Sequence, residues 1–114
     1  LRKSDPGPEF PWKRLYEAGI GAWYEEDLKA VYEQRFAQRL PDVVTIQSAL
    51  NRLGYYVETS GQFDNATRYA MRAMQLHYRP QNHAGDIDAE SVAIIWALLE
   101  KYRPRELEAL LTSN

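Results

Sequence analysis

The spacing of apolar residues along the chain predicts an all-α protein. Apolar positions recur every three or four residues in segments that glycines, prolines and short polar runs separate. The predicted helices cover residues 12–18, 25–38, 43–53, 65–78 and 89–102, and one or two further amphipathic turns cover 105–111.

Two of these segments belong to an internal repeat. The stretch from Gly61 to Pro80 recurs 24 residues later, from Gly85 to Pro104, and both copies end in Tyr-Arg-Pro. In each copy a glycine opens a turn, and a proline stops the helix just beyond its last apolar residue. Such a unit cannot bury its apolar face alone, so we expect the copies to pack together.

The residues between the glycine and the helix set the start of each copy. Asp64 and Asp88 offer carboxylates to the exposed N–H groups of the first helical turn. Phe63 and Ile87 stand just before them, and we expect these apolar side chains to pin the turns inward. With the apolar helix faces they give a predicted core of Ile46, Leu50, Leu53, Phe63, Ala70, Met74, Ile87, Ile95, Leu98 and Leu99.

The segments around the repeat are predicted to support it. Asp42 is placed to cap the helix over 43–53, and Gly54 to close it in the left-handed conformation. A domain of about 60 residues buries only around 60% of the surface that its unfolded chain exposes. We therefore expect the helix over 25–38, as a packed spacer, and the C-terminal turns to cover apolar flanks that the repeat leaves open.

Composition narrows the classes of function. The chain of 114 residues carries a net charge of −2 and has no cluster of basic residues, which argues against a nucleic-acid partner. No apolar run approaches the ~20 residues that a membrane-spanning helix needs, and we expect a monomer. The eight tyrosines and three tryptophans suit either the core of a small helical domain or a surface on which carbohydrate stacks.

The first eleven residues hold three prolines and cannot form a regular element internally. Asp5 precedes Pro6 and is therefore expected to be extended. Residues two apart in an extended segment point the same way, so Lys3 and Asp5 present an ammonium and a carboxylate to one place. Two interpretations stay open from these residues alone: an exposed polar turn, or a shared chemical site.

The order and spacing of several short motifs resemble the three-helix peptidoglycan-binding module that is attached to bacterial wall hydrolases. The resemblance covers residues 42–102, and Met74 departs from it, because the family usually has phenylalanine there. It implies a small three-helix bundle, here with an N-terminal arm and short flanking helices, whose partner is peptidoglycan. The motifs are Ile46-Gln47, Leu50, Leu53-Gly54-Tyr55, Gly61-Gln62-Phe63-Asp64, Thr67, Ala70, Met74-Gln75, Gly85-Asp86-Ile87-Asp88 and Leu98-Leu99.

The opening residues are similar to the closing motif of type-2 N-acetylmuramoyl-L-alanine amidases. That motif runs from Arg2 to Pro8 and is followed by Phe10 and Trp12. The resemblance implies that Asp5 is a zinc ligand and that Lys3 stabilises the oxyanion of the reaction. Zinc with three protein ligands and one open position polarises a carbonyl and activates water, which is what amide hydrolysis needs.

The amidase family takes its other two zinc ligands from histidines that would lie upstream of this chain. His77 and His83 lie in the module and match no ligand position. We predict that His77 is a packing residue on the helix surface or partly buried, and that His83 is a solvated loop residue.

The resemblances together imply a division of the chain like that of AmiD-like envelope amidases. Residues 1–24 would end a catalytic domain, 25–40 form the spacer helix, 41–104 form the binding module and 105–114 form a short helix and tail. No signal peptide is visible, and the chain opens in the middle of a motif, so we expect a piece of a longer, periplasmic zinc enzyme. The piece alone is expected to bind no zinc and to be inactive.

The residues that would contact the wall are predicted from the turn after 43–53 and from the expected solvent side of the next helix. For Tyr55 a structural role is favoured, because a residue just past a helix-ending glycine packs back on that helix. Two other classes of function stay open: a helical protein-interaction domain without glycan binding, and a helix-turn-helix DNA reader, which the acidic balance disfavours. The predicted wall contacts are Tyr56, Arg68, Tyr69, Arg72 and Gln75.

Overall fold

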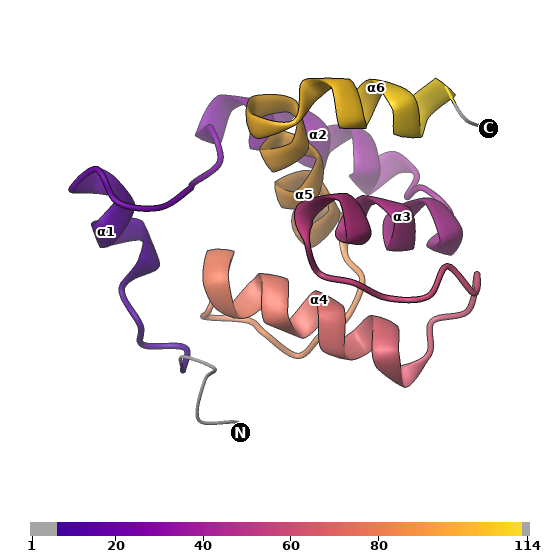
Figure 1. Cartoon of the computed structure of the whole chain (residues 1–114), viewed down its shortest axis with the longest axis horizontal. Helices are drawn as coiled ribbons and strands as arrows, with labels where there is room; N and C mark the ends of the chain where they lie inside the picture. Colours follow the sequence, from indigo (N-terminus) through magenta and orange to yellow (C-terminus); the bar gives the residue numbers. More distant parts are fainter. Residues whose placement is uncertain (1–6, 113–114) are drawn as a thin grey trace.

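Residues 7–112 of the computed structural model are described, and this part of the chain holds six helices and no strand. The prediction of an all-α fold is confirmed, and the bounds of the two repeat helices agree with it. None of the helices in this part is both long and apolar enough to cross a membrane. The helices are α1 (Trp12–Glu17), α2 (Glu26–Gln38), α3 (Val43–Leu53), α4 (Asn65–Tyr78), α5 (Ala89–Tyr102) and α6 (Pro104–Thr112) (Figure 1).

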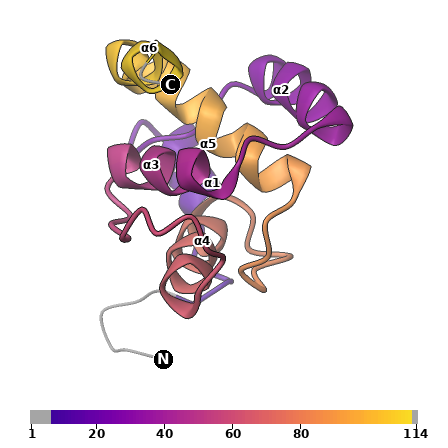
Figure 2. The same cartoon turned by 90° about the vertical axis from the view of Figure 1, so that its right-hand side faces the viewer.

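Helix α5 is the centre of the fold. Every residue from Ser91 to Leu99 is buried, as expected for a helix that is apolar on all sides. Helices α2, α3, α4 and α6 all pack on it, and Figure 2 shows α2 and α6 on two sides of its C-terminal half. The supporting role predicted for α2 and for the C-terminal turns is therefore confirmed.

The apolar face of α2 reaches α5 through aromatic rings. Tyr32 stacks on Phe36 with ring centroids 5.8 Å apart, and Phe36 meets Trp96 of α5 edge-on at 5.3 Å. On another side of α5, Leu107 and Leu110 of α6 are buried. Such contacts complete the core of a domain that three helices alone would leave marginal.

The predicted core is confirmed at most positions and wrong at one. Phe63 is 39% exposed, so it does not pin its turn inward. Ile87, its counterpart in the second copy, packs half-buried against the core, as do Leu53 and Ala70. The fully buried members of the predicted set are Ile46, Leu50, Met74, Ile95, Leu98 and Leu99.

Three aspartates cap the three helices of the module in the same way. The side chains of Asp42, Asp64 and Asp88 accept the backbone N–H groups of Thr45, Thr67 and Ser91 at 3.0, 2.9 and 2.8 Å. The caps predicted for α3, α4 and α5 are confirmed. Gly54 ends α3 with φ of 100°, also as predicted.

The N-terminal arm is tied to the module through Lys101 of α5. Its ammonium donates to the hydroxyl of Tyr16 at 2.8 Å and to the carbonyl of Trp23 at 3.0 Å, and it pairs with Glu25. Tyr102 adds a second attachment, since its hydroxyl lies 3.1 Å from both the N and the O atom of Trp23. Residues 12–25 are thus held against the ends of α4 and α5.

Candidate functional site

Two buried glutamines hold the turns that shape the module surface. Gln47 of α3 accepts the N–H of Gly61 at 2.9 Å and donates to the hydroxyl of Thr67 at 2.8 Å and to the carbonyl of Gln62 at 3.0 Å. One amide therefore fixes both the turn and the first turn of α4. Because these bonds hold the turn in place of Phe63, the ring of Phe63 is free to face outward.

Gln75 repeats the arrangement one helix later. It accepts the N–H of Gly85 at 2.8 Å and donates to the hydroxyl of Ser91 at 2.9 Å and to the carbonyl of Asp86 at 3.0 Å. Its side chain is fully buried. The prediction that Gln75 lies on the solvent side of α4 is wrong, because it stands on the face of the helix that Met71, Met74 and Tyr78 bury.

Gly85 brings the loop before α5 very close to α4. It is buried, has φ of 90°, and a Cβ atom placed on it would lie 2.7 Å from the carbonyl oxygen and the Cγ atom of Arg68. Only glycine fits this approach without a shift of the backbone. The loop consequently covers part of Arg68 and lies beside Arg72, whose Cβ would be 3.4 Å away.

Arg68 is the centre of a small polar patch on this side. Its guanidinium donates to the carboxylate of Asp86 at 2.7 Å and to the carbonyl of Ala84 at 3.3 Å, and it lies 4.9 Å from the centroid of the Phe63 ring. Its charge is thus partly neutralised within the protein. What remains open to a ligand is the exposed Phe63 ring and the outer edge of the guanidinium.

The other predicted contacts do not all share this patch. Tyr69 is 68% exposed and lies on the outer side of α4, whereas Arg72 is half-buried beside the 84–86 loop. Tyr56 is 84% exposed and lies elsewhere, on the connector after α3. There it lines a hollow with residues of α3 and of the start of α6. The structure therefore brings Arg68 and Arg72 together and places Tyr56 at a separate site.

Tyr55 confirms the structural role favoured from the sequence. Its backbone N–H is bonded to the carbonyl of Leu50 at 2.9 Å, and the ring packs half-buried against the core. Burial raises the pKa of Tyr55 to about 12. Tyr55 and Tyr56 thus point to opposite environments, one inward and one outward.

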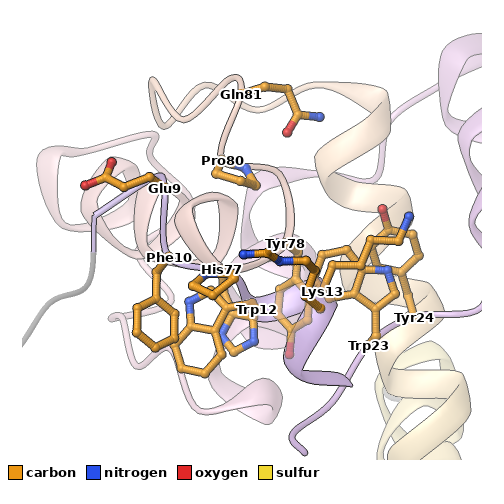
Figure 3. Close-up of a pocket in the computed structure, with 12 residues that line it drawn as sticks. Glu9, Phe10, Trp12, Lys13, Trp23, Tyr24, His77, Tyr78, Pro80 and Gln81 are labelled. Carbon is orange, nitrogen blue, oxygen red and sulfur yellow. The ribbon is translucent and has the colours of Figure 1, made fainter. Parts of the chain in front are cut away.

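An aromatic cleft between the arm and the end of α4 was not predicted. The cleft has a volume of about 490 Å³, and the residues that line it are drawn in Figure 3. Trp12 stacks on His77 with centroids 4.0 Å apart, and His77 stacks in turn on Tyr78 at 4.1 Å. Because 65 positions separate Trp12 from His77 in the sequence, no local pattern could reveal that they meet. The remaining walls are formed by Glu9, Phe10, Pro11, Lys13, Arg14, Trp23, Tyr24, Pro80 and Gln81.

The two histidines, His77 and His83, are both partly buried. His77 is partly buried, as predicted, and burial lowers its pKa to about 4, so it is neutral at pH 7. His83 is half-buried rather than fully solvated, and its Nδ1 lies 2.7 Å from the carbonyl of Pro80. Across residues 7–112 there is no group of three or more His, Cys, Asp or Glu side chains able to hold a metal ion. Lys3 and Asp5 lie outside the described residues.

Three aspartate-capped helices, joined by the contacts of two buried glutamines, make up the module. Residues 39–95 match the family model described as "Putative peptidoglycan binding domain". The chain belongs to this family.

Some relatives match over a longer part of the chain, and an amidase is among them. The chain is 41% identical over 102 residues to N-acetylmuramoyl-L-alanine amidase AmiD of Escherichia coli, a match that covers 89% of this chain and 37% of that protein. A crystal structure of AmpDH3 from Pseudomonas aeruginosa matches with a TM-score of 0.79 and 43% identity over 89% of this chain and 40% of that one. A second AmpDH3 structure, in complex with an anhydromuramic pentapeptide, has a TM-score of 0.78 and 44% identity, with the same coverage. The chain thus spans about two fifths of the length of these relatives.

Proposed function

We propose that this chain is the wall-binding part of an N-acetylmuramoyl-L-alanine amidase that works in the periplasm. One observation carries the proposal. The family match covers residues 39–95 only, whereas the similarity to the amidase of Escherichia coli extends over 102 residues at 41% identity. The sequence similarity to the amidase must therefore include segments outside the module. Proteins that contain such a module but are otherwise unrelated have no reason to share these segments.

The close attachment of the arm supports the same proposal. Lys101 and Tyr102 hold Tyr16 and Trp23 against the module, so a catalytic part preceding the arm would have a fixed position relative to the wall-binding surface. We place the end of that catalytic domain in residues 1–24, the spacer helix in 25–40, the module in 41–104 and a short helix and tail in 105–114. The role of the module is to concentrate the enzyme on its insoluble substrate.

For the catalytic part we propose the roles that the amidase motif implies. Asp5 would be one zinc ligand, and the ammonium of Lys3 would stabilise negative charge on the carbonyl oxygen under attack. The amidase motif implies that the other two ligands are histidines upstream of this chain, and residues 7–112 contain no group of three or more His, Cys, Asp or Glu side chains able to hold a metal ion by itself. Zinc would activate the attacking water in that setting, and no step is assigned to residues of the module.

For the wall contact we propose the exposed polar and aromatic side chains of the module. Tyr69 and the outer edge of Arg68 offer a ring and a guanidinium on the outer side of α4, and Arg72 lies beside them. Tyr56 offers a second aromatic surface. Gln75 is left out, because its amide is buried and fully engaged.

Co-sedimentation with purified sacculi tests the proposal. We expect weak, reversible retention that falls when Arg68 and Tyr69 are both changed to alanine, with an unchanged melting curve. The matched control is Arg105→Ala with Val31→Ala, an exposed arginine and an exposed apolar residue on α6 and α2, away from α4 (Figure 1). No retention of the wild-type chain would instead favour a protein-interaction domain that has kept the fold and lost wall binding.

A further inference from the structure

A polar hollow of about 370 Å³ lies between the C-terminal half of α3, the connector after it and the start of α6. It is separate from the aromatic cleft of Figure 3, with which it shares no lining residue. Its α6 side lies beyond residue 95, where the family match ends, so the hollow combines the module with its flanking helix. Its lining residues are Ser48, Asn51, Arg52, Tyr56, Arg103 and Glu106.

The backbone under Tyr56 is fixed although its ring is open to solvent. The side-chain oxygen of Asn51 accepts the N–H of Val57 at 2.6 Å, immediately after Tyr56. On the other side, the N–H of Tyr55 is bonded to Leu50 and its ring is packed on the core. An exposed aromatic ring on a held backbone loses little conformational freedom when a ligand binds to it.

Arg103 is the residue in the hollow whose positive charge has no partner among the described residues. In the first copy of the repeat, the equivalent Arg79 is 3% exposed and pairs with both oxygens of Asp88, the cap of the next helix, at 2.8 and 3.0 Å. After the second copy, α6 begins at once with Pro104, and no capping aspartate precedes it. Among residues 7–112, the guanidinium of Arg103 consequently has no hydrogen-bond or ion-pair partner.

The charge of the hollow favours an anion. Arg52 and Arg103 give two positive charges and Glu106 one negative charge, which leaves a net charge of +1 (2 − 1) in a chain whose total is −2. Arg52 uses one nitrogen on Glu106, and a guanidinium has five N–H donors, so it retains capacity for a second acceptor. Carboxylates are the preferred partners of such donors.

We propose that this hollow binds a free carboxylate of the peptidoglycan stem peptide, with Arg103 as its main partner and Tyr56 packed against the adjoining residue. The proposal rests on the proposed function and names the part of the wall that is recognised. The glycan strand fits less well, because its hydroxyl and N-acetyl groups are neutral and would leave Arg103 without a counter-charge. The carboxylate of the ligand would thus take the place at Arg103 that the carboxylate of Asp88 takes at Arg79.

The test is a titration of the ¹⁵N-labelled chain with the soluble peptide L-Ala-γ-D-Glu-L-Lys-D-Ala-D-Ala, monitored by the shifts of backbone amide resonances. We expect saturable shifts at Asn51, Tyr56 and Arg103. Arg103→Gln is expected to weaken binding about tenfold or more, the loss expected for a charge-assisted hydrogen bond. Glu106→Gln is expected to strengthen it, because Arg52 is then freed from its internal partner. The matched control is Arg105→Gln, an exposed arginine that does not line the hollow.

The two proposals fail in different ways. If the wild-type chain is retained on sacculi but the peptide shifts no resonance around the hollow, the stem-peptide site is overturned and the proposed function stands. Equal weakening by Arg103→Gln and Arg105→Gln would also overturn the site. Loss of sacculus retention in the wild-type chain would overturn the proposed function itself, whatever the peptide does.

Discussion

The side-chain oxygen of Gln75 accepts the backbone N–H of Gly85 at 2.8 Å inside the protein, where both residues are buried. The same relationship joins Gln47 to Gly61, where the distance is 2.9 Å. In both cases the amide nitrogen continues to the hydroxyl of the third helical residue, Thr67 or Ser91. Each glutamine therefore stands in for a missing backbone partner and couples one helix to the start of the next.

Gln75→Ala is predicted to destabilise the module more than a surface change does. The substitution leaves the buried N–H of Gly85 without its acceptor and the hydroxyl of the buried Ser91 without its donor. Each buried group left unpaired costs about 1–3 kcal/mol. The midpoint of urea unfolding, monitored by circular dichroism, measures the loss. Gln81→Ala in the exposed loop after α4 is the control and should be close to neutral. Equal midpoints for the two variants would contradict the role assigned to Gln75.

Gly85→Ala and Gly54→Ala separate backbone conformation from packing. Both glycines have left-handed φ values, 90° and 100°, so in both variants the conformation costs about 1–2 kcal/mol. Only at Gly85 does the added Cβ meet another atom, the carbonyl oxygen of Arg68 at 2.7 Å, while the space at Gly54 is open. Gly85→Ala should therefore lower the free energy of unfolding by more than Gly54→Ala, as measured by chemical denaturation. The reverse order would show that the loop can move away from α4 at no cost.

Asp64→Ala and Asp88→Ala should differ although both remove a helix cap. Loss of the Asp64 cap is expected to cost about 0.5–2 kcal/mol. Asp88 also pairs with the buried guanidinium of Arg79. Without Asp88, Arg79 would keep one ionic partner, Glu90 at 3.1 Å, and the neutral carbonyl of Asn82 at 3.0 Å. Because Asp88 is itself partly exposed, we expect a loss of about 2–4 kcal/mol, below the full effect of breaking a buried pair. Thermal and urea melts of the two variants give the comparison, and a smaller effect at Asp88 would refute it.

The sequence was sufficient to predict most of the fold because its signals are local. The aspartates, glycines and prolines that start and stop α3, α4 and α5 act within a few residues of their own position. The bounds of α4 and α5 were accordingly predicted as the structure has them. The predictions were wrong for the side chains of Phe63 and Gln75, whose direction depends on contacts with another helix.

The candidate site could be predicted only in part, for the same reason. Tyr56 and Tyr69 are exposed for reasons that the sequence can show. Tyr56 lies beyond the end of the apolar face of α3, and Tyr69 lies on the side of α4 opposite its apolar face. The pairing of Arg68 with Asp86 depends on how Gly85 brings a distant loop to α4. The identical Tyr-Arg-Pro endings did not indicate that Arg79 is buried and Arg103 exposed. That difference arises from the segment after each copy. A loop and the capped helix α5 follow Arg79, whereas α6 follows Arg103 directly.

Stability is predicted to fall as the pH drops from about 6.5 to about 4 because of His77. Its pKa is lowered to about 4 by burial, against 6.5 in the unfolded chain, so in this window the unfolded state binds the extra proton. The lowered pKa values of Asp64 and Asp88 act only at more acidic pH.

His77→Phe keeps a ring between Trp12 and Tyr78 but removes the titrating group. Urea melts at pH 7 and pH 4.5 should show a smaller drop in stability for this variant than for the wild-type chain. A matching drop in both would assign the pH dependence to other groups.

Amide hydrolysis is expected to require the longer protein. The 114-residue chain is expected not to cleave the muramoyl–L-alanine bond even when zinc is added, because three protein ligands make a catalytic zinc site and residues 7–112 contain no such group. A single carboxylate, that of Asp5, is not expected to bind zinc strongly enough to displace the water molecules bound to the ion. In the longer protein, with the catalytic part present, Asp5→Ala should abolish zinc retention measured by metal analysis of the purified enzyme. Lys3→Ala should leave the metal bound and lower kcat by about 10²–10³, as the loss of an oxyanion-stabilising donor does. Cleavage of muropeptides by the 114-residue chain, detected by chromatography of the products, would show that a second active site exists.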